Sequence, residues 1–183
     1  MVQVLRRTPQ QDRARRRIEH VLDTADELLA GEGAHALTTT RVAEAAGISV
    51  GSLYQWFPDK DAIAEALALR YVEDFAHVLD DLDGDVGAAI DAFADAFRAT
   101  PGFRAMWFGG LRTERLRDVT RPALDRIATA LAERLDAPHD VALVCVTTAD
   151  ALLRQAFRQH PDGDEAVIAE AKLLLTAYLD RRL

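Results

Sequence analysis

Hydroxyl, amide and aromatic side chains gather in one short stretch of the chain, between Thr38 and Lys60. Its second half carries almost no formal charge and exposes Val50, Ser52, Tyr54, Gln55 and Trp56. A short helix with such a neutral, donor- and acceptor-rich face suits insertion into the major groove of DNA. The alternative is a helical hairpin in which Tyr54 and Trp56 fill the core. The spacing of these residues alone does not decide between the two.

Two short helices joined by a tight turn must position these side chains. The first helix has an apolar face, formed by Val42, Ala43 and Ala46. Thr38, Thr39 and Thr40 are candidates for its N-cap. Gly47 supplies the left-handed residue that ends a helix, and Ile48 gives the apolar contact that usually follows.

The second helix of the pair begins and ends at recognisable residues. Ser49 can cap it, and Leu53 and Phe57 lie one turn apart and face inward. Pro58 pushes the preceding residue out of helical geometry, so this helix stops there. Asp59 can cap a third, longer helix.

The pattern T-x-x-x-V-A-x-x-A-G-I-S-x-G-S-L-Y-x-x-F-P-D-K, from Thr38 to Lys60, resembles the DNA-binding signature of TetR (tetracycline-repressor-like) transcriptional regulators. The resemblance implies an all-α fold. It places a three-helix helix-turn-helix DNA-binding domain at residues 1–60 and a helical effector-binding and dimerisation domain at residues 61–183. It further implies a ligand-responsive regulator, a repressor, that binds double-stranded operator DNA as a homodimer and is released by a small-molecule effector.

The resemblance and the residue types together give a predicted DNA-binding set. Backbone phosphates would be held by Thr38, Thr39, Arg41, Tyr54, Lys60, Arg16 and Arg17. Base edges would be faced by Val50, Ser52, Gln55 and Trp56, beside the cap Ser49. Gln55 is the best candidate for pairing with an adenine.

Net charge agrees with a DNA-binding N-terminal part. Residues 1–60 hold eight basic and eight acidic residues, so the whole net charge of −8 belongs to the rest of the chain. Four arginines, 13, 15, 16 and 17, crowd the start of a predicted helix from about Asp12 to Ala30. That placement opposes the helix dipole, and phosphate contact would explain it. A solvated basic face is the alternative.

Glycines and prolines divide the remainder into predicted helices. These run from about 59 to 82 and near 86–99, 101–108, 111–136, 140–160 and 164–182. Pro122 is expected to divide the helix at 111–136 or to start its second half. Asp81, Asp83 and Asp85 have calcium-loop spacing, but the required glycine is Val86, so an acidic linker is expected.

Two features of the C-terminal part carry functional meaning. Bulky side chains suited to a small-molecule pocket are Phe75, Phe93, Phe97, Phe103, Met106, Trp107 and Phe108, with Thr148 as an orienting polar group. The alternative is that these side chains form ordinary hydrophobic core. The family resemblance favours a pocket for an apolar or aromatic effector. The segment from Val141 to Ala149 is apolar on almost every side and must be covered all round.

That helix and the last one predict a two-fold interface of four helices. The expected interface residues are Leu152, Phe157, Ile168, Leu175 and Leu179. A monomer with a thicker core is the competing interpretation.

Other functions have little support in the sequence. The five histidines are scattered without metal-ligand spacing, and no nucleophile elbow or phosphate loop occurs, so neither a catalytic residue, a metal nor a cofactor is expected. A single cysteine, Cys145, and the lack of a signal peptide or membrane span predict a cytoplasmic protein with no membrane partner. The remaining alternative is an α-helical small-molecule-binding protein that has lost DNA binding.

Overall fold

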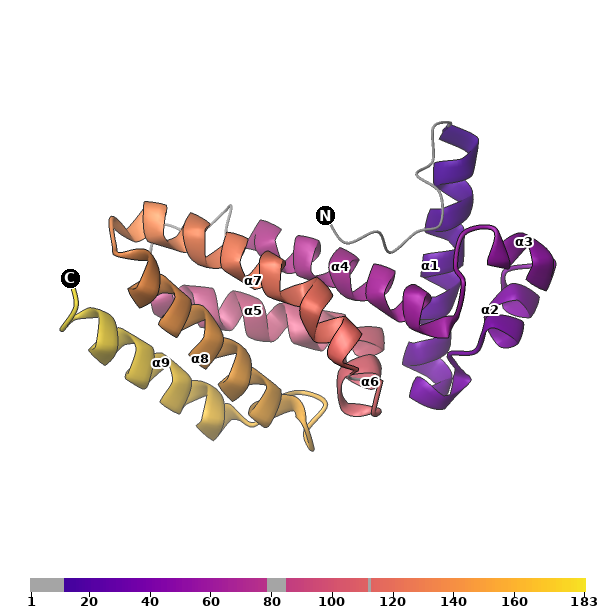
Figure 1. The fold of residues 1–183 in the computed structure, drawn as a ribbon. Coiled ribbons are helices and arrows are strands. Elements are labelled where there is room, and N and C mark those ends of the chain that lie inside the picture. Colours follow the sequence, from indigo (N-terminus) through magenta and orange to yellow (C-terminus); the bar gives the residue numbers. More distant parts are fainter. Residues whose placement is uncertain (1–11, 79–84, 112) are drawn as a thin grey trace. The chain divides into compact units, whose positions relative to one another are not determined.

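A computed structural model describes residues 12–78, 85–111 and 113–183. These residues form helices and turns with no strand among them, which confirms the all-α prediction (Figure 1). The helices are α1 (Asp12–Glu32), η1 (Ala34–Ala36, a 3-10 turn), α2 (Thr39–Ala45), α3 (Val50–Tyr54), α4 (Lys60–Val78), α5 (Val86–Ala99), α6 (Pro101–Phe108), α7 (Glu114–Leu135), α8 (His139–Phe157) and α9 (Glu165–Leu179).

The helix boundaries closely follow the glycines and prolines that were expected to separate the helices. The helices predicted at 86–99 and 101–108 have these bounds, and the others differ by a few residues at their ends. The prediction that Pro122 divides its helix is wrong, because α7 is continuous through it. Pro122 is exposed, so water can satisfy the carbonyl that its missing N–H leaves free. The predicted end of α4 near residue 82 and the acidic linker at 81–83 lie outside the described residues.

The chain packs as two compact units. The first comprises residues 1–71 and 101–119, and the second comprises residues 72–100 and 120–183. Helices α4 and α7 therefore contribute residues to both units. The predicted boundary at residue 60 divides the chain by role rather than by packing, and it stays a prediction.

The core of the first unit is centred on α1, which packs against α2, η1 and α6. Its apolar stripe is sealed from water, with Val21, Ala25 and Leu29 fully buried. Tyr71, the last residue of α4 in this unit, stacks edge-to-face on Phe103 of α6, with ring centroids 5.3 Å apart. Aromatic packing of this kind fixes α6 against α1 and α4.

A partly buried polar contact joins three helices of this unit. The Tyr71 hydroxyl of α4 donates to Asp26 of α1. Neighbouring Arg70 pairs with Asp23 at 2.6 Å. Gly102 of α6 lies directly against the Asp26 carboxylate and the Tyr71 hydroxyl. No side chain fits at position 102 unless Asp26 moves.

We expect Gly102→Ala to lower the free energy of unfolding by about 1–3 kcal/mol, because the methyl group pushes Asp26 away from Tyr71 and breaks a partly buried hydrogen bond. Thermal and urea unfolding measure the change. Gly31→Ala is the matched control, since nothing lies within 4 Å of a Cβ placed at Gly31 and alanine favours the helix. Equal stability of the two variants would contradict this packing.

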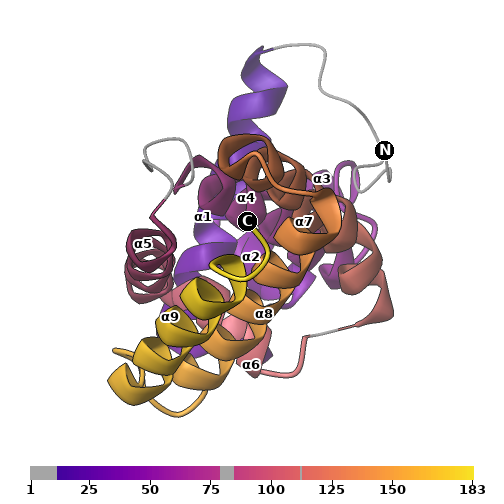
Figure 2. The ribbon, with the colours of Figure 1, turned by 90° about the vertical axis from the view of Figure 1, so that its left-hand side faces the viewer.

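In the second unit α9 lies beside both α8 and α5 (Figure 2). Three aromatic rings join α4, α5 and α8: Phe75 stacks on Phe97 at 5.5 Å, and Phe97 lies 5.2 Å from Phe157. Arg98 of α5 covers the Phe157 ring and pairs with Glu165 at the start of α9, at 2.7 Å. The polar cap over an aromatic core fixes these helix ends together.

Candidate nucleic-acid interface

The helix-turn-helix forms as its caps predict. Thr38 is the N-cap of α2, and its hydroxyl accepts from the Arg41 backbone N–H at 3.1 Å. Gly47 adopts the left-handed conformation, with φ of +65°, and the Ile48 N–H closes the turn onto the Ala43 carbonyl. Ser49 then caps α3 by accepting from the Ser52 N–H at 3.1 Å.

The recognition helix α3 is short, with five residues. It spans Val50 to Tyr54, Gln55 is its C-cap, and Trp56 lies beyond its end. Leu53 and Phe57 are completely buried, as predicted. These two side chains anchor the segment on the first unit, so its remaining side chains are set by a rigid core.

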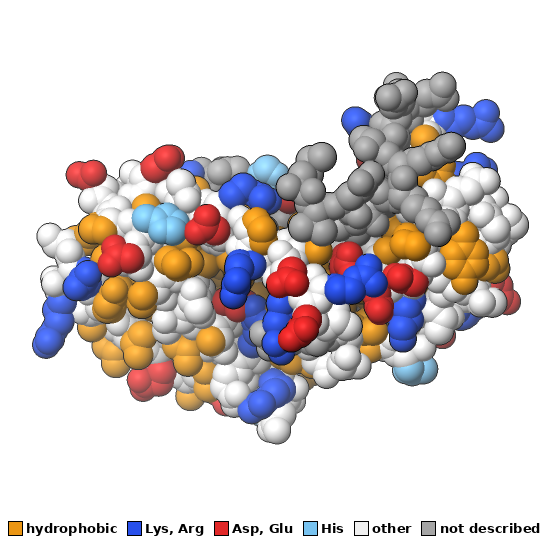
Figure 3. Space-filling model, in the orientation of Figure 1, with side chains coloured by type: hydrophobic (Ala, Val, Ile, Leu, Met, Phe, Trp, Pro, Cys, Tyr) orange, Lys and Arg blue, Asp and Glu red, His pale blue; other side chains and the backbone are white. Residues whose placement is uncertain are grey.

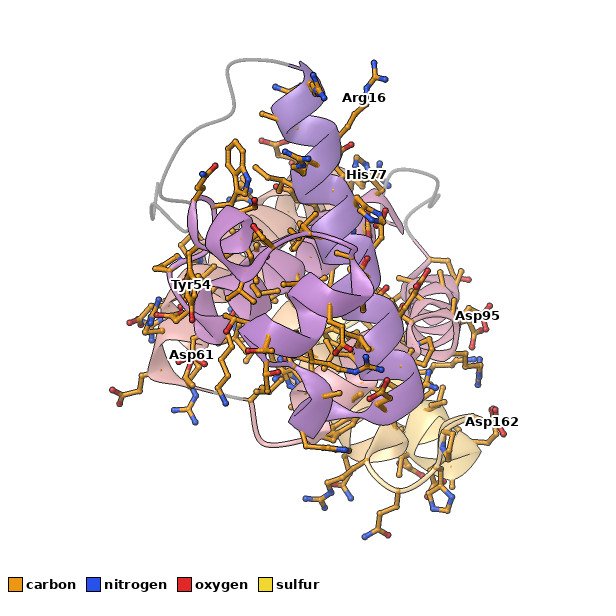
Figure 4. The ribbon with its side chains drawn as sticks, turned by 90° about the vertical axis from the view of Figure 1, so that its right-hand side faces the viewer. Arg16, Tyr54, Asp61, His77, Asp95 and Asp162 are labelled. Carbon is orange, nitrogen blue, oxygen red and sulfur yellow. The ribbon has the colours of Figure 1, made fainter. Side chains whose placement is uncertain are left out.

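The outward side of this segment carries the predicted reading residues. Tyr54 is 41% exposed and Gln55 is exposed, while Val50, Ser52 and Trp56 are half-buried (Figure 4). The interpretation in which Tyr54 fills the core is therefore wrong. Trp56 shares its ring between the protein and the surface, which suits an aromatic side chain at an interface.

Hydroxyl groups from both helices of the motif meet at the surface. The Tyr54 hydroxyl of α3 lies 3.3 Å from the hydroxyl of Thr39 in α2. Thr38 and Ser49, which cap the two helices, are also exposed. Hydroxyls arranged in this way are typical donors to DNA phosphate oxygens.

Lys60, the first residue of α4, is exposed. Asp59 caps that helix by accepting from the Ala62 N–H at 2.8 Å. An ammonium group in the first turn adds its charge to the positive end of the helix dipole, so this end of α4 attracts anions.

Arg41 stands apart from the predicted phosphate set because it is paired within the chain. Its guanidinium lies 2.6 Å from Glu32 at the end of α1 and 3.5 Å from Glu44. The hydrogen bond from Arg41 lowers the pKa of Glu32 and keeps this carboxylate charged. The pair ties α2 to α1 at the surface, and the phosphate role of Arg41 stays a prediction.

The basic start of α1 is exposed. Arg13, Arg15, Arg16 and Arg17 all lie at the surface, and within the described part of the chain none of them forms an ion pair. Figure 4 shows Arg16 extending away from the first turns of α1. Their mutual repulsion and the helix dipole disfavour this arrangement in the free protein, and a phosphate backbone would relieve both.

Two supporting contacts had no signal in the sequence. His20 of α1 places its Nε2 3.3 Å from the carbonyl oxygen of Ala46, at the end of α2. Arg115 of α7 reaches Asp59, with 3.4 Å between Nη1 and Oδ2. Both contacts join residues far apart in the chain, so spacing arguments could not find them.

The predicted ligand-binding side chains divide between the two units. Phe103, Met106, Trp107 and Phe108 belong to the first unit, and Phe75, Phe93, Phe97 and Thr148 belong to the second. Phe103 stacks on Trp107 at 5.2 Å, and Phe75 packs on Phe93 and Phe97. Thr148 is half-buried. Each unit thus holds part of the sequence cluster.

The residues predicted at a dimer interface are mostly covered by their own chain. Phe157, Ile168, Leu175 and Leu179 are buried, and Leu152 is half-buried. A side chain that is already sealed in its own core cannot contact a partner, so these four are core residues. Leu143 and Val144 of α8 are exposed in the single chain, so coverage on every side of α8 would need a second copy and stays a prediction.

Other chemistry finds no support in the described residues. They contain no group of His, Cys, Asp and Glu side chains that could hold a metal ion. Burial raises the pKa of the Cys145 thiol, so this cysteine is a poor nucleophile. Searching the same residues finds no helix with both the length and the apolar character needed to cross a bilayer.

Comparison with known proteins identifies the architecture. Residues 21–67 match the family described as "Bacterial regulatory proteins, tetR family". Residues 80–183, more than half of the chain, match "Tetracyclin repressor-like, C-terminal domain". The chain belongs to the TetR family. It is therefore a transcriptional regulator with a DNA-binding helix-turn-helix, and α2 and α3 are that motif.

Individual TetR-type relatives agree over nearly the whole chain. The HTH-type transcriptional regulator AlkX of Mycobacterium tuberculosis is 29% identical over 180 residues, which cover 89% of this chain and 85% of AlkX. A TetR-family regulator from Streptomyces coelicolor is 35% identical with a TM-score of 0.71, covering 91% of this chain and 99% of its own. The multidrug binding protein EbrR, solved with imidazole, shares the fold: it is 21% identical with a TM-score of 0.71, over 88% and 94% of the chains.

Proposed function

We propose that this TetR-family protein is a ligand-responsive repressor that binds a two-fold symmetric operator as a homodimer. The observation that carries the proposal is the outward side of the segment from Val50 to Trp56. It is neutral, rich in donors and acceptors, and held by the buried anchors Leu53 and Phe57. Lys60, shortly after Trp56, and the arginines at the start of α1 add exposed positive charge.

The binding mode follows from these residue types. Gln55 and Trp56 face base edges in the major groove, with Val50 and Ser52 beside them, and Gln55 pairs with an adenine. Thr38, Thr39, Tyr54, Lys60, Arg16 and Arg17 hold phosphates. The cap Ser49 sets the start of the recognition helix. Two such heads, one from each subunit, enter successive major grooves about 34–36 Å apart.

Exposed apolar side chains of α8 and α9 support the homodimer. Four large hydrophobic residues on these helices are exposed, with these exposed fractions: Leu143 (37%), Val144 (45%), Leu173 (65%) and Leu174 (51%). Among the described residues, the other exposed large hydrophobic residues are Tyr54 and Leu183. Figure 3 shows hydrophobic side chains gathered over α8 and α9. We call these four residues the α8–α9 face. A second copy that contributes the same face would cover it and form a four-helix interface.

The proposed effector is apolar or aromatic, because aromatic side chains dominate the residues predicted to bind it. Phe75, Phe93 and Phe97 in one unit, and Phe103 with Trp107 in the other, supply the flat apolar surfaces that such ligands need. EbrR, the relative in fold, was solved with ethidium and with imidazole. Effector binding favours a dimer in which the two helix-turn-helix motifs are spaced wrongly for the operator. Helices α4 and α7 transmit this change, because each contributes residues to both units. Release of bound operator in a screen of small molecules tests this step.

Two substitutions distinguish base recognition from phosphate binding. We expect Gln55→Ala to relax preference at one base position, because this residue pairs with a base edge. We expect Lys60→Ala to weaken binding to all sequences alike and to lower the log–log salt slope by about 0.9, one phosphate contact. Affinities for the selected operator and its single-base variants, titrated over salt, measure both. Loss of specificity in both variants alike would contradict the assignment.

A further inference from the structure

Charged groups of opposite sign surround the first turn of α4, next to Lys60. Asp59 caps the helix, and Glu65, one turn further on, is almost fully buried, with 4% of its side chain exposed. Arg115 from the first turn of α7 reaches both carboxylates. Its Nε lies 2.7 Å from Glu65 Oε1, and its Nη1 lies 3.4 Å from Asp59 Oδ2.

The pairing matters because Glu65 cannot be solvated where it lies. Burial raises the pKa of the Glu65 carboxyl, while the positive charge of Arg115 opposes that rise and Asp59 and Asp61 add to it. Removing the partner of a buried carboxylate strongly destabilises the protein, because the remaining charge is left uncompensated. Arg115 therefore compensates a buried charge and, with the same guanidinium, holds the residue that caps α4.

We propose that Arg115 is a positioning residue for operator binding. It holds the first turn of α4 from α7 and so fixes Lys60, the residue next to the cap, where it grips phosphate. This inference rests on the proposed function, since it requires Lys60 to be a phosphate contact. Arg115 lies 56 residues along the chain from Asp59, outside the helix-turn-helix, and acts on DNA only through the start of α4.

The test is a set of operator titrations over salt with a parallel measurement of thermal unfolding. Arg115→Gln is expected to weaken binding about ten-fold and to lower the salt slope by about 0.9, as Lys60→Gln does. The Lys60→Gln/Arg115→Gln double variant is expected to bind no more weakly than Lys60→Gln, because the two residues act through one contact. Arg121→Gln removes an equal charge from an exposed site on α7 and should change neither the operator affinity nor the salt slope.

A second double variant separates positioning from simple stability. Glu65→Gln/Arg115→Gln removes both members of the buried pair, so its thermal stability is expected to recover toward that of the wild type. Its operator affinity is expected to stay low, because the tie to Asp59 is gone. Recovery of affinity together with stability, or additive losses in the Lys60→Gln/Arg115→Gln variant, would overturn the positioning role. A salt slope unchanged by Lys60→Gln would instead refute the phosphate role of Lys60 in the proposed function, and the inference with it.

Discussion

Leu173→Glu combined with Val144→Glu is expected to leave the protein folded as a monomer and to weaken operator binding by about 10²–10⁴-fold. Both side chains belong to the exposed α8–α9 face, so the substitutions open no cavity in the core. Two carboxylates on each copy would bring like charges together in a self-complementary interface and would have to be desolvated there. The affinity falls because the second head then binds as a separate molecule and loses the effective concentration of a linked one.

Sedimentation equilibrium and operator titration measure the two effects on the same samples. Ala130→Glu is the control, because it adds a carboxylate at an exposed position inside α7. We expect this control to remain dimeric and to bind normally. A double variant that still sediments as a dimer would contradict the assignment of the α8–α9 face.

Phe57→Ala is expected to lower the free energy of unfolding by about 3–5 kcal/mol and to abolish specific binding. Phe57 is completely buried, and its removal leaves a cavity beneath the recognition segment. Gln55, two residues earlier, is exposed, so Gln55→Ala should change stability by less than about 0.5 kcal/mol. Urea unfolding at one fixed protomer concentration compares the variants, because the stability of a dimer depends on concentration.

This pair of substitutions tests which side of the segment faces the protein. If Gln55→Ala destabilised the protein as much as Phe57→Ala, the reading residues would be packed in the core. The proposed contact with bases would then be impossible without unfolding the segment.

Local chemistry made the helices and the helix-turn-helix predictable from the sequence. Gly47 ends α2, Ser49 caps α3 and Asp59 caps α4, as their side chains and backbone preferences require. Residues of this kind act within a few positions of themselves. The segment that carries the proposed reading residues could therefore be located before any tertiary contact was known.

The failures concern contacts over long distances in the chain. The apolar stripe of α9 predicted that Ile168 and Leu175 are buried, but periodicity cannot tell whether the same chain or a second copy covers them. The ion pair of Arg41 with Glu32 at the end of α1 had no signal in the sequence, and the phosphate role expected of Arg41 stays a prediction. Pro122 was expected to break α7, and an exposed position in the helix tolerates it.

Selection of bound sequences from random double-stranded DNA by the wild-type protein tests the central claim most directly. The account predicts enrichment of two inverted half-sites whose centres lie about one helical turn apart, with binding that weakens steeply as salt rises. Enrichment of single unpaired sites, or no enrichment over the starting pool, would contradict a dimer that reads DNA with the exposed side of α3.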